Sequence, residues 1–197
     1  ATTDIYTLSL HDALPICTYL HGKSRLDKCI IICMPILDPH SLEFFSKSSE
    51  QTRRLGTRLG SGLMIGDVIC LAGDLGSGKT TFTQGISKGW GSLNHVTSPT
   101  FVLVNQYKKP EGTILYHMDA YRLENAEEAF SLDIDEMVQS GALVIEWPDR
   151  IKAALPGEYL WIDLSWVDEF QRRMVFTPMG DRYRSLLTAF RQKAFGG

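Results

Sequence analysis

The chain has 197 residues, of which 44% are hydrophobic and 22% are charged, so it is long enough and apolar enough for one globular domain with one core. Its formal net charge is -3 and its pI is near 6.0, whereas a sequence-independent grip on nucleic acid requires a clustered excess of Lys and Arg. Any connection with RNA is therefore expected to be indirect.

The first part of the chain contains a segment that resembles a translated sequencing adapter. Residues Thr7 to Ile16 read TLSLHDALPI, which matches letter for letter one reading frame through a widely used library adapter. Translated adapter sequence is not part of a natural protein and carries no information about its fold. We therefore expect residues 1–33 to be an artefactual, non-native extension, Met34 to be the true start, and residues 34–197 to form a single domain.

A targeting peptide is the alternative explanation of this first part. Lys28 precedes an apolar stretch, Cys29 to Leu37, but Asp27 and the lack of a small-residue cleavage site disfavour that reading. The stretch has about half the ~20 residues that a bilayer span needs and is broken by Pro35, so no membrane span is expected. Cys70 lies within an apolar run and is expected to be a buried hydrophobe, which fits a cytoplasmic protein.

Helix and strand patterns alternate along the rest of the chain. A serine cap before apolar residues at helical spacing indicates a helix, a short apolar run indicates a strand buried on both faces, and β-branched runs around a turn indicate a hairpin. The expected elements are a helix from Ser48 or Ser49 to about Gly60 or Gly62, a strand at Val68 to Ala72, a helix at Thr81 to Trp90, a hairpin of Phe101 to Tyr107 with Thr113 to Met118, a helix near Ala126 capped by Asn125, strands at Ala142 to Ile145, Tyr159 to Leu164 and Met174 to Thr177, and a final helix capped by Asp181.

A phosphate-binding pattern follows the strand that is expected at Val68 to Ala72. Gly73 to Thr80 reads GDLGSGKT, matching G-x-x-x-x-G-K-[ST], whose glycines leave backbone N–H groups free to wrap a phosphate. Lys79 is expected to face solvent and reach the outer phosphates, and Thr80 to give its hydroxyl to Mg²⁺, while the helix terminus adds partial positive charge. The strand–loop–helix context favours a three-layer P-loop NTPase fold of the α/β class, with a mostly parallel central sheet flanked by helices, over a glycine-rich turn without nucleotide.

Two acidic residues are candidates for the catalytic groups. Hydrolysis requires an acid near the metal and a group that positions water. Glu146 ends one expected strand and Asp119 ends another, so both should lie at the carboxyl edge of the sheet, where ligands bind in open α/β folds. The structural alternative for each is a carboxylate that caps the next helix or faces water.

Four other polar or aromatic features have weaker signals. Ser98-Pro99-Thr100 offers a hydroxyl for a switch that senses the terminal phosphate, or simply begins a strand. His95 and His117 lack metal-like spacing and are expected to be ordinary surface or half-buried residues. Trp147 is expected either to pack in the core or to shape the nucleotide site.

Taken together, four motifs resemble the bacterial TsaE family in content, order and spacing, over about residues 48–176. They are GDLGSGKTT from Gly73, SPTF from Ser98, HMDAYRL from His117 and EWPDR from Glu146. The segment EFQRR from Glu169 departs from the Gly- and Arg-rich version that is common in this family, which leaves a nucleotide contact there open.

The resemblance implies an Mg²⁺-dependent ATPase and assigns roles to individual residues. It implies that Gly76, Ser77, Gly78, Lys79, Thr80 and Thr81 hold the ATP phosphates, that Thr80 and Glu146 bind Mg²⁺, that Asp119 acts at the nucleotide in hydrolysis, and that Ser49 touches ATP.

The resemblance also implies partners. TsaE works with TsaD and TsaB, which place a threonylcarbamoyl group on the adenosine beside the anticodon of tRNAs that read codons starting with A, and ATP hydrolysis resets that complex. The protein would thus meet tRNA only indirectly. A small-molecule kinase would need an arginine-bearing lid, which nothing between Thr81 and Pro148 supplies, and a GTP switch would need an Asn-Lys-x-Asp motif, which this sequence lacks. An interaction protein without turnover stays open as an alternative.

Overall fold

The structure is a computed structural model that describes residues 40–94, 96, 103–123 and 126–195. The expectations for residues 1–33 and for Met34 lie outside the described residues. So do those for Asn125, His95 and Ser98-Pro99-Thr100.

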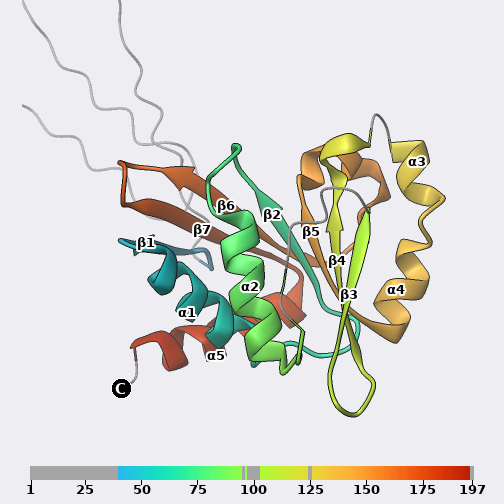
Figure 1. The fold of residues 1–197 in the computed structure, drawn as a ribbon, viewed down its shortest axis with the longest axis horizontal. Coiled ribbons are helices and arrows are strands. Elements are labelled where there is room, and N and C mark those ends of the chain that lie inside the picture. Colours follow the sequence, from blue (N-terminus) through green and yellow to red (C-terminus); the bar gives the residue numbers. More distant parts are fainter. Residues whose placement is uncertain (1–39, 95, 97–102, 124–125, 196–197) are drawn as a thin grey trace, which may run out of the picture. The chain divides into compact units, whose positions relative to one another are not determined.

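The centre of the described region is a sheet (Figure 1). Its strands are β1 (Leu42–Ser46), β2 (Val68–Ala72), β3 (Val104–Lys108), β4 (Ile114–Asp119), β5 (Gly141–Glu146), β6 (Tyr159–Trp166) and β7 (Arg172–Met179). They form a seven-stranded sheet in the order β1-β7-β6-β2-β5-β4-β3. Neighbours are parallel from β6 through β2 and β5 to β4, whereas the pairings of β3 with β4 and of β7 with β6 and β1 are antiparallel. The sheet is therefore mixed but largely parallel.

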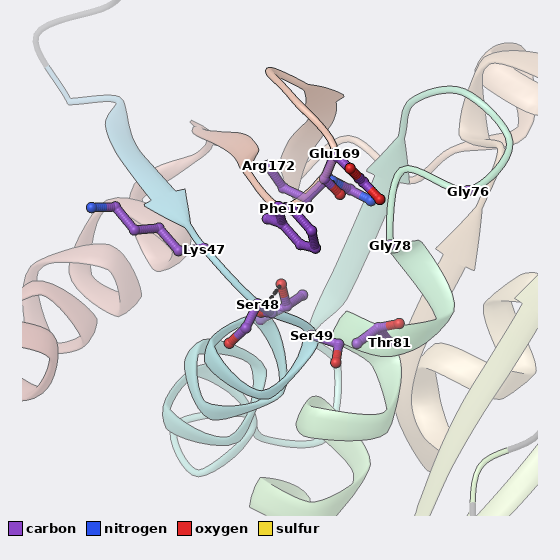
Figure 2. Close-up of a pocket in the computed structure, with 10 residues that line it drawn as sticks. Lys47, Ser48, Ser49, Gly76, Gly78, Thr81, Glu169, Phe170 and Arg172 are labelled. Carbon is purple, nitrogen blue, oxygen red and sulfur yellow. Dashed lines mark hydrogen bonds between the residues drawn. The ribbon is translucent and has the colours of Figure 1, made fainter.

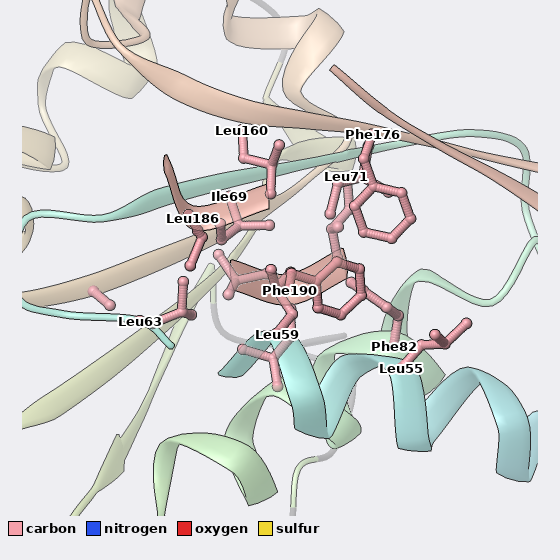
Figure 3. Close-up of a cluster of buried hydrophobic side chains, with 14 of the residues drawn as sticks. Leu55, Leu59, Leu63, Ile69, Leu71, Phe82, Leu160, Phe176, Leu186 and Phe190 are labelled. Carbon is pink, nitrogen blue, oxygen red and sulfur yellow. The ribbon is translucent and has the colours of Figure 1, made fainter. Parts of the chain in front are cut away.

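Helices cover both faces of this sheet. They are α1 (Ser49–Gly60), α2 (Lys79–Trp90), α3 (Ala126–Phe130), α4 (Ile134–Ser140) and α5 (Asp181–Phe195), with 3-10 helices η1 (Ala120–Arg122) and η2 (Pro148–Ala154). Ile69 and Leu71 of β2 pack into a cluster with α1, α2 and α5, part of which Figure 3 shows. Val68 and Cys70 point the other way, into a cluster with α3, α4 and both 3-10 helices. The alternation along β2 thus builds the core on both faces.

Most of the expected elements are present. Ser48 caps α1, since its side chain accepts a hydrogen bond from the Gln51 backbone N–H at 3.2 Å, and β2 has the expected bounds with every residue buried. The expected hairpin is β3 with β4. Strand β1 and helix α4 were not expected, and α2 begins at Lys79, two residues before the predicted Thr81.

Helices α1 and α2 lie side by side and touch through glycines (Figure 1). A Cβ atom added to any of four glycines would lie between 2.0 and 2.4 Å from a backbone oxygen of the opposite helix. The four are Gly56 and Gly60 in α1, and Gly85 and Gly89 in α2. Because real side chains cannot approach backbone so closely, only glycine permits this contact. Helix α2, which begins at the phosphate loop, therefore packs directly against α1.

The stretch Cys29 to Leu37, for which no membrane span is expected, lies outside the described region, whereas Cys70 lies within that region. None of the helices in the described region is both long enough and apolar enough to cross a membrane. Cys70 is buried and forms no disulfide, as its apolar surroundings predicted, and burial raises the pKa of its thiol well above the usual range. A thiol in that state is a small hydrophobe rather than a reactive group.

Candidate functional site

The phosphate loop connects β2 to α2 and is shaped by glycine. Gly73 has a φ of +132°, and a Cβ atom there would lie 2.1 Å from the carbonyl oxygen of Leu164 in β6. Gly78 has a φ of +105° and is the N-cap of α2. The first backbone hydrogen bond of that helix runs from the Phe82 N–H to the Gly78 oxygen at 2.8 Å. The first position requires glycine for both space and backbone angle, and the second for its angle.

Lys79 is enclosed by the loop rather than facing solvent. The residue is 5% exposed, and its Nζ donates to the carbonyl oxygens of Gly73 at 2.7 Å and Asp74 at 2.8 Å. Its ammonium also lies 3.8 Å from the ring centroid of Trp147. Burial lowers the pKa of Lys79, although the charge of Glu146 opposes that change. The expectation of a solvent-facing lysine was therefore wrong, because α2 begins at Lys79 and draws the side chain back under the loop.

A chain of hydrogen bonds links the loop to the central strands. The Thr80 hydroxyl donates to Glu146 Oε2 at 3.2 Å, and Glu146 Oε1 lies 2.9 Å from His117 Nε2. His117 is fully buried and Glu146 is 3% exposed. The expectation that His117 is an ordinary surface or half-buried residue was wrong. Sequence spacing gave no signal for it, because the contact arises between β4 and β5, which are far apart along the chain.

Asp119 lies beside Glu146, since the two are register partners at the ends of β4 and β5. Its Oδ1 accepts a hydrogen bond from the Tyr121 N–H at 3.0 Å, so Asp119 also caps η1. Burial raises the pKa of Asp119, and the charge of Glu146 raises it further, whereas the Tyr121 bond and the Lys79 charge act in the opposite direction. The capping alternative thus holds for this residue, and its carboxylate still lies next to that of Glu146.

Trp147 has a backbone conformation that is uncommon for a bulky residue. Its φ is +60°, and its N–H donates to the Leu71 oxygen at 3.1 Å. The ring packs against Tyr121, with centroids 5.0 Å apart, and beneath the Lys79 ammonium. The packing alternative for Trp147 is therefore met, because the partly buried ring packs against the second core cluster, and the same ring lies against the loop lysine.

A pocket of about 350 Å³ opens beside the loop. Figure 2 shows that it lies between the amino end of α1, the start of α2, and the turn between β6 and β7, with the ring of Phe170 directed toward α1. Its lining includes Ser49, Thr52, Gly76, Gly78, Thr81, Glu169, Phe170 and Arg172. The fold therefore brings Ser49 and the phosphate loop to one cavity. Glu169, Phe170 and Arg172 of the divergent EFQRR segment line the same cavity. The sequence alone left open whether that segment contacts a nucleotide.

Comparisons with known proteins agree on one family. The family model of the threonylcarbamoyl adenosine biosynthesis protein TsaE matches residues 46–174. The tRNA threonylcarbamoyladenosine biosynthesis protein TsaE of Bacillus subtilis (strain 168) is 37% identical over 74% of this chain and 90% of that protein. The protein of the same name from Nostoc sp. (strain PCC 7120) is 41% identical over 69% of this chain and 85% of that protein.

A solved structure is similar as well. The crystal structure of Bacillus subtilis YdiB has a TM-score of 0.66 and 32% identity, and the match covers 78% of this chain and 96% of that one. The match to the family model extends over more than half of the chain and includes the loop and both acidic strand ends. The chain therefore belongs to the TsaE family, the ATPases of threonylcarbamoyladenosine biosynthesis.

Proposed function

We propose that this protein hydrolyses ATP to ADP and phosphate with Mg²⁺ at the edge of the sheet, in a P-loop NTPase fold. The observation that carries the proposal is the 3.2 Å hydrogen bond between Thr80 and Glu146. It joins the hydroxyl of the phosphate loop to the carboxylate at the end of β5, and these are the two types of protein ligand that hold Mg²⁺ beside a nucleotide in P-loop enzymes.

The loop itself supports phosphate binding. Its residues Gly76 to Thr81 contribute backbone N–H groups at the amino end of α2, where the helix carries partial positive charge. The Lys79 ammonium lies at the loop, where it donates to two backbone carbonyl oxygens that phosphate oxygens would replace as acceptors. The buried Ser77 Oγ has no hydrogen-bond partner among the described residues, so it would donate to a phosphate oxygen only if the loop opened around the phosphate.

The residues present also fit Mg²⁺. Among the described residues no group of three or more His, Cys, Asp or Glu side chains is arranged to hold a metal. That is the expected situation for Mg²⁺, which takes one or two protein ligands and completes its shell with water and substrate phosphates. Thr80 and Glu146 would hold the ion, which would neutralise negative charge on the phosphates. Asp119 would act at the nucleotide in hydrolysis, because it lies beside Glu146 at the same edge.

The pocket beside the loop fits the nucleoside part of ATP. Ser49 and Thr81 both line it at the adjoining starts of α1 and α2 (Figure 2), and Phe170, whose exposed fraction is 69%, offers an aromatic face to a base. Arg172 also lines this pocket. A stacking aromatic in this position replaces the Gly- and Arg-rich segment of the family, so we propose that Ser49 and Phe170 contact the nucleoside.

We propose further that this ATPase serves threonylcarbamoyl modification of tRNA in the cytoplasm through partners of the TsaD and TsaB type. The net charge of -3 supports contact with tRNA through those partners rather than directly. In this role ATP hydrolysis resets the TsaD–TsaB complex between rounds of modification.

The test is a reconstituted reaction in which modified tRNA and released phosphate are measured together. With TsaD, TsaB and ATP, this protein should support many rounds of modification for each TsaD–TsaB complex, and a non-hydrolysable ATP analogue should restrict the reaction to about one round. Multiple rounds with the analogue would contradict a resetting role for hydrolysis. Phosphate transferred to a small molecule instead of water would favour the kinase alternative.

We also propose that residues 1–33 are no part of the native domain, and that residues 34–197 form it. A chain that starts at Met34 should have the same melting temperature as the whole chain, measured by circular dichroism. The matched control removes residues 1–46, and with them β1. Its melting temperature should fall, because β1 pairs with β7 and Phe44 packs in the core. A clear drop for the shorter truncation would mean that residues 1–33 stabilise the domain.

A further inference from the structure

His117 is a buried polar residue that the proposed reaction does not use. It lies on β4 with no exposed surface, and its Nε2 is 2.9 Å from Oε1 of Glu146. Both side chains are almost completely excluded from solvent, at 0% and 4% exposure. A polar ring in such a place requires a hydrogen-bond partner, and among the described residues that partner is Glu146.

The bonding pattern assigns the hydrogen in this contact. A carboxylate oxygen accepts, so the ring nitrogen that faces Glu146 carries the proton and donates it. The other ring nitrogen, Nδ1, is buried and has no hydrogen-bond partner among the described residues. The tautomer with its proton on Nε2 leaves only a lone pair at that buried position, rather than an unsatisfied N–H group.

Glu146 is therefore held at both oxygens. Oε1 receives the His117 bond and Oε2 receives the Thr80 bond, so rotation of the carboxylate would break two contacts in a buried place. The register of β4 on β5 sets this arrangement, because His117 pairs with Val144 and stands diagonally across from Glu146. A one-residue slip would turn the imidazole to the other face of the sheet.

We infer that His117 is a positioning residue, which fixes the Glu146 carboxylate with Oε2 turned toward the Thr80 hydroxyl. This inference rests on the proposed function, in which Thr80 and Glu146 form the Mg²⁺ side of the ATP site. Hydrogen bonds to a metal-binding carboxylate set its orientation before the metal arrives, and their loss typically weakens metal binding by about 10- to 100-fold.

Three variants separate positioning from simple core filling. His117→Leu fills similar space without a donor. His117→Asn introduces an amide, but on a side chain too short to bring its nitrogen to the position of Nε2. His117→Gln brings an amide N–H to about that position. Leu115→Val is the matched control, because Leu115 is equally buried on the same strand and belongs to the core cluster rather than the site.

The measurement is binding of a fluorescent ADP to the whole chain as Mg²⁺ is titrated. His117→Leu and His117→Asn should raise the Mg²⁺ concentration at half-maximal effect by about 10- to 100-fold. His117→Gln should stay within about threefold of wild type, and Leu115→Val should not shift it. Affinity for the ADP in EDTA should be equal in all variants, since the loop is unchanged. If His117→Leu does not fold, the pair His117→Asn and His117→Gln carries the test.

A wild-type Mg²⁺ midpoint in His117→Leu or His117→Asn would overturn the inference and leave His117 as core filling. A shift in His117→Gln as large as in His117→Asn would also overturn it, because the donor would then not matter. Failure of the proposed function looks different: wild-type protein would itself bind the ADP without any response to Mg²⁺, and the inference would fall with the metal site.

Discussion

Replacing Lys79 by alanine should abolish productive binding of ATP and leave the fold in place. The ammonium is the one side-chain cation that lies within the loop, where it bonds to the Gly73 and Asp74 carbonyls. Phosphate oxygens would offer it charged acceptors in place of these neutral ones. Loss of one member of a buried charged pair is worth about 2–5 kcal/mol, so affinity should fall by roughly 30-fold or more.

Two controls accompany the Lys79 prediction, which calorimetric titration with an ATP analogue and Mg²⁺ would check. Lys79→Met keeps the buried aliphatic part of the side chain and should bind as poorly as the alanine variant, with a melting temperature nearer to wild type. Lys88→Ala changes an exposed lysine of the same helix and should bind normally. ATP hydrolysis at the wild-type rate by Lys79→Ala would mean that the phosphate site is elsewhere.

Replacing Glu146 by glutamine should reduce ATP turnover far more than nucleotide binding. Glutamine keeps the size of the side chain, and its amide oxygen can still accept the His117 bond, but the negative charge opposite Thr80 is lost. That charge helps to fix Mg²⁺, which carries the charge that develops in phosphoryl transfer. A single electrostatic group of this kind is worth on the order of 10² to 10³ in rate. Binding should change less, because the loop amides and Lys79 remain.

Phosphate release and ADP binding, measured on the same protein, check this prediction. Glu136→Gln on the exposed side of α4 is the control for loss of one negative charge and should behave as wild type. In the reconstituted reaction Glu146→Gln should stop repeated rounds of tRNA modification. Turnover equal to wild type would remove Glu146 from the site and make Asp119 the metal-side acid.

Local patterns were sufficient to predict the elements that carry the site. The apolar run of β2, the loop after it and the strand ends at Asp119 and Glu146 follow from the sequence, because continuous burial and glycine spacing leave local marks. Strand β1 has a weaker sequence pattern and was not predicted. It is short, lies at the edge of the sheet, and forms through its pairing with β7, which is distant along the chain.

The contacts within the site depended on long-range geometry and could not be predicted. His117 becomes a partner of Glu146 only when β4 lies against β5 in one register. Lys79 is enclosed by the Gly73 and Asp74 carbonyls and by Trp147, which directly follows β5. Phe170 lines the pocket beside the phosphate loop because β6 and β7 pair as an antiparallel hairpin whose turn carries it. Motif spacing reports which groups are present, whereas their burial and mutual orientation belong to the folded sheet.

The glycine contacts between α1 and α2 hold the two helices together as one packed unit. Backbone lies against backbone at four glycines, so there is little space for one helix to slide or rotate against the other. Ser49, at the start of α1, is thereby held at a constant distance from the start of α2. We expect a displacement of the loop to move α1 together with α2, because the glycine contacts leave no space between the two backbones. The surface of α1 that faces away from the sheet would then move in step with the nucleotide.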